Sequence, residues 1–566
     1  MTLTRHGGQI LVDQLKLRGL QRVFSVPGES FLAALDGLHD SGIENIVCRH
    51  EGGAAMMAEA HGKLTGLPGV VFVTRGPGAG NAAAGLHVAQ QDSTPMIAFI
   101  GQIARHHRDR EAFQEVDFPA FFGPLVKWAA EIREAERIPE YVARAWDVAL
   151  AGRPGPVVLS LPEDMLSEQA ETRDIPPTRP APCPDYSAFA DAVLRRLRRA
   201  GRPLVVAGGS GWSAQALADL QVFAETADLP VAVTFRRQDH MDNRHDSYVG
   251  DLGVGMNPAL GQRLARADVV LALGTRLSET ATSGYSLLDP QAPNPRQCLI
   301  HVHPDPTELG RVHRPEMALA APAAEIVSDL AAYATPLANS RIWTAEARAD
   351  FETWQIPQPS PGALQQEAVI AWLSETLPDD AILTNGAGNY AAWLHRYFRF
   401  KRYGTQLAPT SGSMGYGLPA AIAAKLQFPE RCVVCLAGDG CLQMSVTELS
   451  TAAQYGVAII VLVVNNGRYG TIRAHQERHF PGRVSGTELF TPDLPALARA
   501  YGGWGATVSR NEDFPAAFAE AEAAGTLAVL DLRVDPQALS PMMTLDEARA
   551  SGQARTAAPD AGDPTP

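Results

Sequence analysis

One stretch constrains the fold of this chain more than any other, because it predicts two buried strands joined by a helix. An apolar run at residues 433–437 is typical of a buried strand, and it ends in a glycine turn that presents Asp439. Residues 445–455 carry apolar side chains at helical spacing, and a second apolar run at residues 457–464 leads to Asn466. Strands connected in this way are expected to lie parallel, which predicts an α/β fold.

Asp439 and Asn466 leave the two strands at the edge of the sheet where ligands of open parallel sheets gather, so we expect them to face each other. A carboxylate, an amide oxygen and a backbone carbonyl suit Mg²⁺, which usually binds together with phosphate groups. The backbone amides of the glycine turn also favour phosphate charge. The unit therefore predicts a Mg²⁺-diphosphate site, whereas the plain alternative is a turn without a ligand.

The full pattern resembles a known cofactor motif. Gly-Asp-Gly, a helix-length spacer and a strand ending in Asn-Asn are similar to the thiamine diphosphate (ThDP) motif of the acetolactate synthase, pyruvate oxidase and pyruvate decarboxylase superfamily. The resemblance implies that the Asp439 and Asn466 side chains and the Arg468 backbone carbonyl bind Mg²⁺. The residues expected to contact ThDP are Gly28, Gly388, Asn389, Ser413, Met414, Gly438, Gly440, Tyr469 and Gly470.

Glu51 is the candidate catalytic residue of the amino-terminal part. It follows an apolar strand and precedes a helix of small residues, and the segment around it is similar to the catalytic-glutamate segment of ThDP enzymes. The resemblance implies that Glu51 hydrogen-bonds to the pyrimidine ring of ThDP and helps to remove the thiazolium proton. The alternative is a helix-start glutamate that favours the helix dipole.

The same family implies roles for three further residues. Phe113 and Gln114 are expected near the substrate, and both are counted with Glu51 as catalytic. Met414 lies in a glycine-rich loop and is expected to wedge under the bent cofactor. The alternative for Met414 is a methionine that fills a gap in the core.

Length and composition limit the class of protein. A chain of 566 residues is too long for one core and is expected to form about three or four domains. The net charge of −14 argues against a nucleic-acid partner. Without a signal-like start or a membrane-length apolar run, and with only six cysteines, the protein is expected to be cytoplasmic and to have no membrane partner.

Strand and helix patterns alternate through three segments, at residues 1–170, 186–335 and 362–540. We expect three doubly wound Rossmann-like α/β domains with parallel sheets, which is the fold that the resemblance implies. The first would bind the pyrimidine of ThDP, and the last would bind the diphosphate and Mg²⁺. The proline-rich stretch at 168–186 is expected to be a linker, and residues 541–566 are expected to form a flexible tail.

The middle segment does not carry a clear flavin signature. Residues 208–211 are glycine-rich but lack the complete dinucleotide fingerprint. Residues 276–280 read Arg-Leu-Ser-Glu-Thr where acetolactate synthases have a signature close to Arg-Phe-Asp-Asp-Arg. We therefore expect a middle domain without FAD, and a flavoprotein is the alternative.

The leading functional hypothesis is an acetolactate synthase-like enzyme that cleaves or forms a carbon–carbon bond next to the carbonyl of a 2-oxo acid. Thr471 and His475 stand where acetolactate synthases have Met and Trp, so pyruvate condensation itself is weakened as a prediction. The alternatives are a ThDP- and FAD-dependent oxidase and a non-catalytic homologue. The resemblance implies a homodimer as the smallest working unit and a homotetramer as the commoner assembly.

Overall fold

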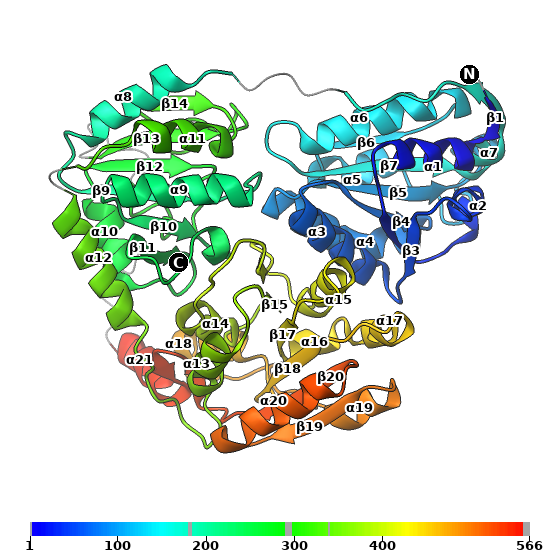
Figure 1. Ribbon diagram of the computed structural model, residues 1–566. Helices are drawn as coiled ribbons and strands as arrows, with labels where there is room; N and C mark the ends of the chain where they lie inside the picture. Colours follow the sequence, from blue (N-terminus) through cyan, green and yellow to red (C-terminus); the bar gives the residue numbers. More distant parts are fainter. Residues whose placement is uncertain (1–2, 179–183, 289–296, 338–339, 558–566) are drawn as a thin grey trace. The chain divides into compact units, whose positions relative to one another are not determined.

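The protein is built on three parallel six-stranded sheets with helices on both faces. The computed structural model describes residues 3–178, 184–288, 297–337 and 340–557 (Figure 1). Each of the three sheets lies in one of the three segments in which the sequence alternates strand and helix patterns. The prediction of three Rossmann-like α/β domains with parallel sheets is confirmed.

The first sheet has the strand order β3-β2-β4-β5-β7-β6. Helices α1, α2, α6 and α7 pack on one face in a common apolar core, and α3 and α4 cover the other face (Figure 1). The strands are β2 (Arg22–Ser25), β3 (Glu44–Val47), β4 (Gly69–Val73), β5 (Met96–Gln102), β6 (Trp128–Glu131) and β7 (Pro156–Pro162). The helices are α1 (Gly7–Leu17), α2 (Leu32–Leu38), α3 (Glu51–Thr65), α4 (Gly76–Asp92), α5 (Phe118–Phe122), α6 (Ile138–Leu150) and α7 (Glu163–Ser167).

The middle sheet has the order β11-β10-β9-β12-β13-β14, which is 3-2-1-4-5-6 when its strands are numbered along the chain, as in dinucleotide-binding folds. Its strands are β9 (Pro203–Ala207), β10 (Val231–Thr234), β11 (Tyr248–Leu252), β12 (Val269–Leu273), β13 (Cys298–His303) and β14 (Met317–Ala320). One apolar core includes α8 (Ser187–Leu197), α9 (Ala214–Thr226) and α11 (Ala323–Tyr333), and another includes α10 (Pro258–Arg266) and α12 (Arg341–Trp354).

The third sheet has the order β16-β15-β17-β18-β20-β19. Its strands are β15 (Ile382–Asn385), β16 (Gln406–Leu407), β17 (Val433–Gly438), β18 (Ile460–Asn465), β19 (Trp504–Val508) and β20 (Ala528–Arg533). The helices of this part of the chain are α13 (Gln366–Thr376), α14 (Ala391–Tyr397), α15 (Gly417–Gln427), α16 (Asp439–Gln443), α17 (Leu449–Gln454), α18 (Gly470–His479), α19 (Leu494–Ala500), α20 (Phe514–Ala523) and α21 (Leu545–Ala557).

The first and third sheets share one topology. When the strands of each are numbered along the chain, both orders read 2-1-3-4-6-5. The chain direction across the sheet reverses between strands 1 and 3, which are β2 and β4 in the first sheet and β15 and β17 in the third. Ligands of open α/β sheets bind at such a reversal, beyond the carboxyl ends of the strands. The topology therefore marks one candidate ligand site on each sheet.

The residues pack into two compact units, which are described separately below. Unit 1 comprises residues 1–182, 409–429 and 445–457, and unit 2 comprises residues 183–408, 430–444 and 458–566. Unit 1 thus contains the first sheet together with α15 and α17, and unit 2 contains the middle and third sheets.

The structure refines several boundaries. The helix expected at residues 445–455 is a short 3₁₀ turn, η6 (Val446–Glu448), followed by α17. The expected linker at 168–186 includes β8 (Gln169–Thr172), which pairs antiparallel with β1 (Leu3–His6). This pairing needs a partner more than 160 residues away, so the local composition could not reveal it.

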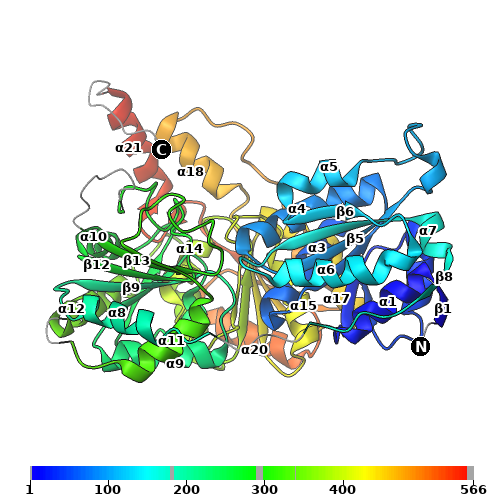
Figure 2. The same ribbon diagram turned by 90° about the horizontal axis from the view of Figure 1, so that it is seen from above.

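The flexible tail expected from residue 541 is corrected for most of its length. Strands β21 (Ala538–Ser540) and β22 (Met543–Thr544) form a small antiparallel sheet, and α21 follows. In Figure 2, α21 lies beside α18, and an apolar cluster that includes Ala474 and Ala548 joins the two helices. The remainder of the expected tail, residues 558–566, lies outside the described residues.

A buried carboxylate fixes α21 to α18. Arg549 of α21 donates through Nη2 and Nε to the two oxygens of Glu477, both at 2.9 Å, and Arg473 donates to the same group at 3.0 Å. These hydrogen bonds hold the pKa of Glu477 down at about 2. A Cβ atom on Gly552 would lie 2.3 Å from the Glu477 carbonyl oxygen, so the helices approach at a distance that only glycine allows.

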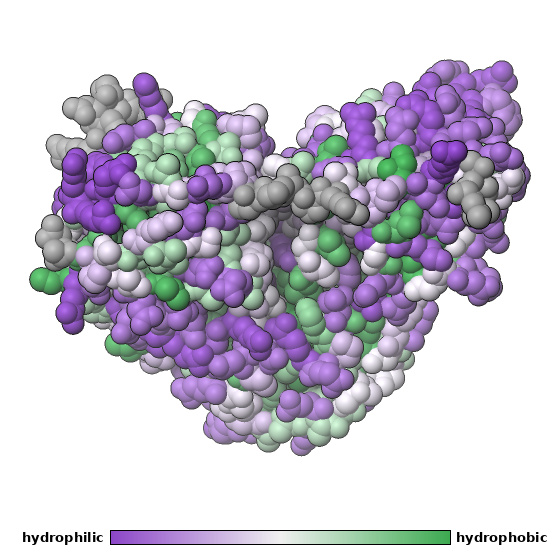
Figure 3. Space-filling model, turned by 45° about the horizontal axis from the view of Figure 1, so that its top comes forward, coloured by the Kyte–Doolittle hydropathy of each residue, from purple (hydrophilic) through white to green (hydrophobic). Residues whose placement is uncertain are grey.

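The surface shows no large segregation of apolar residues on the face drawn in Figure 3, where small apolar patches are scattered among hydrophilic ones. This mixture is usual for protein surfaces. Across the parts of the chain that the structure describes, no helix combines the length and the apolar character needed to cross a membrane.

We predict that Arg549→Met loosens α18 and lowers the Tm by about 2–4 °C, the shift for a loss of about 1 kcal/mol in a domain of 150–250 residues. Because the folded pKa of Glu477 lies below its ordinary value of 4.5, this stabilisation is complete above pH 4.5 and is lost as the pH falls towards 2. Thermal unfolding of both proteins across that pH range measures the effect. Arg510→Met, which removes an exposed arginine paired with Glu512, is the matched control.

A Tm difference between parent and Arg549→Met that stayed constant from pH 7 to pH 3 would contradict this account of Glu477.

Candidate functional site

The predicted metal residues lie at the reversal point of the third sheet and at the end of the strand next to it. Strands β17 and β18 pair in register, with Gly438 opposite Val464, so Asp439 and Asn466 follow neighbouring strand ends. Asp439 is the first residue of α16, where backbone amides favour a negative charge. The geometry brings Asp439 and Asn466 to one edge of unit 2, as the strand-helix-strand pattern predicts.

Asp439 is a buried carboxylate with neutral donors. Its Oδ1 accepts from the Gly440 amide at 2.9 Å, and its Oδ2 accepts from the Gly467 amide and the Thr491 hydroxyl, both at 3.0 Å. Burial raises the pKa of the Asp439 carboxyl above its ordinary value, although these donors favour the charged form. A divalent cation would supply the opposite charge that this carboxylate needs.

The loop after β18 presents two further oxygens. The Asn466 side-chain oxygen accepts from the Arg468 amide at 3.2 Å and so turns back over its own loop. Arg468 forms an isolated antiparallel bridge with Glu488, in which the hydrogen bonds use the Gly467 carbonyl and the Tyr469 amide. Neither of these bonds uses the Arg468 carbonyl, which faces away from the partner segment.

The donor set fits Mg²⁺ better than a transition metal. One carboxylate, one amide oxygen and one backbone carbonyl are all hard oxygen ligands. Among the described residues, no group of three or more His, Cys, Asp or Glu side chains could hold a metal ion. The oxygen set around Asp439 contains one such side chain, so it would rely on phosphate and water oxygens to complete the shell.

The predicted cofactor glycines of unit 2 leave no room for side chains. A Cβ atom on Gly440 would lie 2.7 Å from the Tyr469 ring, and one on Gly388 would lie 2.7 Å from the Tyr390 ring. A Cβ atom on Gly438 would lie 3.0 Å from the same Tyr390 ring. Gly388 also has a φ of +150°, which favours glycine. Two tyrosine rings therefore pack directly on the backbone of these turns.

Asn389 and Thr471 connect the loop after β15 to the start of α18. The Thr471 hydroxyl donates to the Asn389 side-chain oxygen at 2.9 Å and accepts from the Asn389 amide at 3.0 Å. The Asn389 side chain also donates to the Leu539 carbonyl at 3.0 Å. Gly470 opens α18 directly before Thr471, and a Cβ atom there would lie 3.2 Å from the side-chain Nδ2 of Asn466. All the predicted unit 2 residues thus share one edge.

In unit 1, Glu51 opens α3 and lies over the glycine-rich start of α4. The Asn81 side-chain amide donates to Glu51 Oε2 at 2.9 Å. A Cβ atom on Gly78 would lie 3.2 Å from Glu51 Oε1, so this turn lies directly against the carboxylate. The Asn81 amide is thus a neutral donor that fixes the orientation of the Glu51 carboxylate. Glu51 itself is half-buried.

A second buried carboxylate fixes the segment before Glu51. Glu448 Oε1 accepts from the backbone amides of Arg49 and His50 at 3.2 and 3.0 Å, and the Thr451 hydroxyl donates to Glu448 Oε2 at 2.6 Å. Burial raises the pKa of Glu448 above its ordinary value. The start of α3 is therefore held by a residue from η6, nearly 400 positions away.

The other predicted residues of unit 1 lie on loops that leave the first sheet. Gly28 follows β2, and a Cβ atom there would lie 2.6 Å from Thr74 at the end of the neighbouring β4. Gln114 adopts a left-handed φ of +65°, and its carbonyl accepts from the Gly76 amide at 3.3 Å. Phe113 beside it is 75% exposed, so its aromatic ring is available to a ligand or a partner.

Ser413 and Met414 lie in the loop before α15. The Ser413 hydroxyl is 3.0 Å from the Ser411 hydroxyl. Met414 is half-buried. Unit 1 thus carries Glu51 and the Met414 loop, and unit 2 carries the predicted metal residues.

Sequence reasoning did not assign roles to Asn81, Glu448 or Thr491. Each contacts a predicted residue or the segment beside it only through the tertiary fold. Asn81 lies in the glycine-rich start of α4, directly after β4, so its place at the reversal point of the first sheet was the available signal. Thr491 lies in an irregular segment that carries no pattern of its own.

The reversal point of the middle sheet is filled by the protein's own side chains. It lies between β9 and β12, where Gly208 and Gly274 follow the strands. The Trp212 indole donates to the Gly208 carbonyl at 2.9 Å, and its Nε1 would lie 3.4 Å from a Cβ atom on Gly274. Arg237 Nε donates to the Gly209 carbonyl at 2.8 Å. These contacts do not fit a loop that is open to a dinucleotide.

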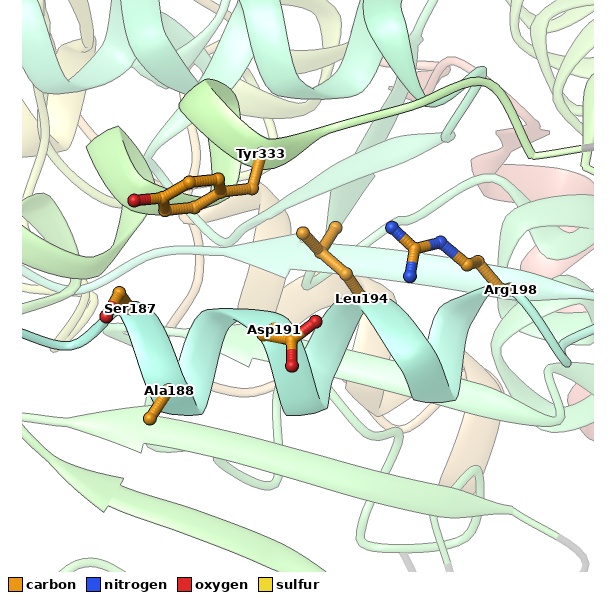
Figure 4. Close-up of a pocket in the computed structure, with 6 residues that line it drawn as sticks. All are labelled: Ser187, Ala188, Asp191, Leu194, Arg198 and Tyr333. Carbon is orange, nitrogen blue, oxygen red and sulfur yellow. The ribbon is translucent and has the colours of Figure 1, made fainter.

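A separate surface hollow lies between α8 and α11 (Figure 4). Asp191 and Leu194 line it from α8, Arg198 lines it from the residue after α8, and the Tyr333 ring faces them from the end of α11. None of the predicted site residues lines this hollow. It therefore carries no part of the candidate site.

Comparison with known proteins agrees with the division of the chain into three α/β segments. Three family models match the chain: "Thiamine pyrophosphate enzyme, N-terminal TPP binding domain" at residues 5–121, the "central domain" at 190–330 and the "C-terminal TPP binding domain" at 386–532. The two TPP-binding matches each cover part of one of the two sheets that share one strand order.

Full-length relatives give the same result. The acetolactate synthase large subunit of Parasynechococcus marenigrum (strain WH8102) is 32% identical over 555 residues, which covers 94% of this chain and 88% of that protein. The acetolactate synthase isozyme 2 large subunit of Escherichia coli (strain K12) is 31% identical over 520 residues, covering 90% and 92%. With its three matched domains and these relatives, the chain belongs to the thiamine pyrophosphate enzymes and is acetolactate synthase-like.

Proposed function

We propose that this protein is a ThDP- and Mg²⁺-dependent carboligase or decarboxylase that acts on a 2-oxo acid or a related carbonyl compound. The observation that carries the proposal is the pair of candidate sites beyond the carboxyl ends of the strands in two sheets with one strand order. One site presents Glu51 with its donor Asn81, and the other presents Asp439 with Asn466. Relatives named acetolactate synthases support the reaction class.

In this proposal Asp439, the Asn466 side chain and the Arg468 carbonyl would hold Mg²⁺, whose charge would favour binding of the cofactor diphosphate at this edge of unit 2. The burial of Asp439 among neutral donors supports a cation there.

When bound, ThDP supplies a carbon nucleophile that attacks a carbonyl and holds the electrons when a carbon–carbon bond breaks. Glu51 would hydrogen-bond to the ring nitrogen of the pyrimidine, which favours the imino form of the neighbouring exocyclic amine, and that form would accept the thiazolium proton. Asn81 keeps the Glu51 carboxylate oriented through its hydrogen bond to Oε2. Glu448 holds the backbone just before Glu51, so the start of α3 does not shift as charge moves.

Thr471 and His475 support a substrate pocket that differs from that of acetolactate synthases. Thr471 is smaller and more polar than the Met expected there, and its hydroxyl is tied to Asn389. Burial lowers the pKa of His475 below its ordinary value, so the neutral imidazole is favoured at neutral pH. Phe113 and Gln114 remain the proposed substrate contacts from unit 1.

We extend the proposal to an enzyme that works without FAD, because Trp212 and Arg237 fill the reversal point of the middle sheet. The proposed assembly is a homodimer or homotetramer, since the resemblance implies sites completed between subunits. Cys48, Cys298 and Cys435 are thiols, which agrees with a cytoplasmic location.

The function is tested with a panel of 2-oxo acids in the presence of ThDP and Mg²⁺. We expect CO₂ release with at least one acid, and Glu51→Gln should slow it by about a hundredfold, the scale of a lost acid–base group. The cofactor affinity should change far less, because the metal and diphosphate dominate binding. Proton–deuterium exchange at the thiazolium carbon measures removal of the thiazolium proton, the step that Glu51 is proposed to assist, and it needs no substrate.

Glu140→Gln is the matched control, because Glu140 is an exposed carboxylate of α6 in the same unit. If Glu51→Gln exchanged the thiazolium proton as fast as the parent, Glu51 would be only a helix-start carboxylate.

We predict that Asp439→Ala lowers the affinity for ThDP in the presence of Mg²⁺ by about a hundredfold or more, since even outer contacts of a metal site are worth about 10–100-fold. Titration of the cofactor-free variant measures this loss. Asp493→Asn serves as control, because Asp493 caps α19 through its side-chain oxygen and asparagine caps equally well. Unchanged affinity in Asp439→Ala would refute the metal site.

We also predict that the purified protein carries no stoichiometric flavin and that added FAD leaves turnover unchanged. The physical reason is the Trp212 indole against Gly208 and Gly274. The absorption spectrum of the protein and its rate with and without FAD provide the measurement. Bound flavin whose removal stops turnover would overturn the prediction.

A further inference from the structure

A buried charged cluster joins α3 and α4 in unit 1. Lys63 of α3 pairs with Glu59 one turn earlier, at 3.1 Å between Nζ and Oε1, and also with Asp92 at the end of α4. The side chains of both carboxylates are fully buried, and that of Lys63 is 12% exposed. Breaking such a buried pair by removing one member is costly, because a charge is left without a partner.

The two carboxylates also grip both ends of the loop that carries Met414. At the first end, the Thr410 amide donates to Asp92 Oδ1 at 2.7 Å, and the Thr410 hydroxyl donates to the same oxygen. At the other end, the Tyr416 hydroxyl donates to Glu59 Oε2. The Lys63 ammonium lies 5.3 Å from the centre of the Tyr416 ring. The seven-residue segment from Thr410 to Tyr416 is thus held at both ends.

Every carboxylate oxygen of the cluster has a donor. Thr94 donates to Glu59 Oε1 at 2.6 Å, and Lys63 reaches that oxygen and Asp92 Oδ2. Tyr416 and Thr410 supply the other two oxygens. A fully satisfied network in a low-dielectric interior defines one arrangement of the groups that make it. The loop is therefore fixed to α3 and α4 by directional bonds.

This attachment fixes one part of the proposed chemistry. Helix α3 carries Glu59 and Lys63, and α4 ends at Asp92. The loop contains Ser413 and Met414, which bear on the shape of the bound cofactor. From the geometry we infer that Glu59, Lys63 and Asp92 are positioning residues that hold the Met414 loop in a fixed place on α3 and α4. This inference rests on the proposed function.

The test uses Tyr416→Phe, which removes one hydroxyl and keeps the ring. In the cofactor-free full chain, amide hydrogen exchange of residues 411–415 should rise about tenfold, the factor for one hydrogen bond to a charged group. With ThDP and Mg²⁺, proton–deuterium exchange at the thiazolium carbon should slow by about tenfold. The ThDP affinity should change by less than about threefold, because the diphosphate site in unit 2 is untouched.

Tyr403→Phe is the matched control, because it removes a hydroxyl that donates to the Trp212 carbonyl at 3.1 Å in unit 2. It should leave both exchange rates at the parent values. Thr410→Ser, which keeps both donors to Asp92, should also behave as the parent, whereas Thr410→Val should resemble Tyr416→Phe.

Parent-like exchange of the loop in Tyr416→Phe and Thr410→Val would overturn the inference. A parent protein that does not accelerate thiazolium exchange over free ThDP would instead refute the proposed function. The loop measurement in the cofactor-free chain decides the positioning role in either case.

Discussion

Buried carboxylates that accept backbone amides from distant segments hold this structure together. Asp439 accepts from the loop after β18, Glu448 accepts from the segment before α3, and Asp92 accepts from the loop before α15. Asp239 does the same for the three consecutive amides of residues 404–406 in unit 2. An amide left without a partner in the interior costs free energy, so each carboxylate fixes both its own position and that of the loop it serves.

The loops served in this way are those that carry the candidate chemistry. A parallel sheet gives rigid strands, but its strand exits are loops, and loops need further contacts to become precise. In the third sheet, tyrosine rings pack against the glycines of the loops that follow the strands. In the first sheet, hydrogen bonds from Asn81 and to Glu448 fix the loop before α3 and the start of that helix. The same fold therefore reaches a defined geometry by two different kinds of contact.

The sequence predicts the parts of this arrangement that depend on local pattern. The apolar runs around Asp439 and Asn466 place both residues at neighbouring strand ends, and the structure agrees. The contacts of Glu448 with Arg49 and His50 join residues about 400 positions apart, and no local pattern encodes them. Helix α21 was missed for a related reason. Its composition resembles a tail, and its order depends on Arg549 meeting Glu477, 72 positions earlier.

The docking of α21 on α18 also has a consequence for the order of synthesis. Strands β15 to β20 can pair once residue 533 has been made, but Glu477 gains its α21 guanidinium only after Arg549 has followed. Domains tend to fold as the chain emerges, from the amino terminus onward. Helix α18, which begins beside Asn466 and Tyr469, is therefore completed only after Arg549 has emerged. A nascent chain of this protein would form its sheets before α18 is fixed beside the candidate site.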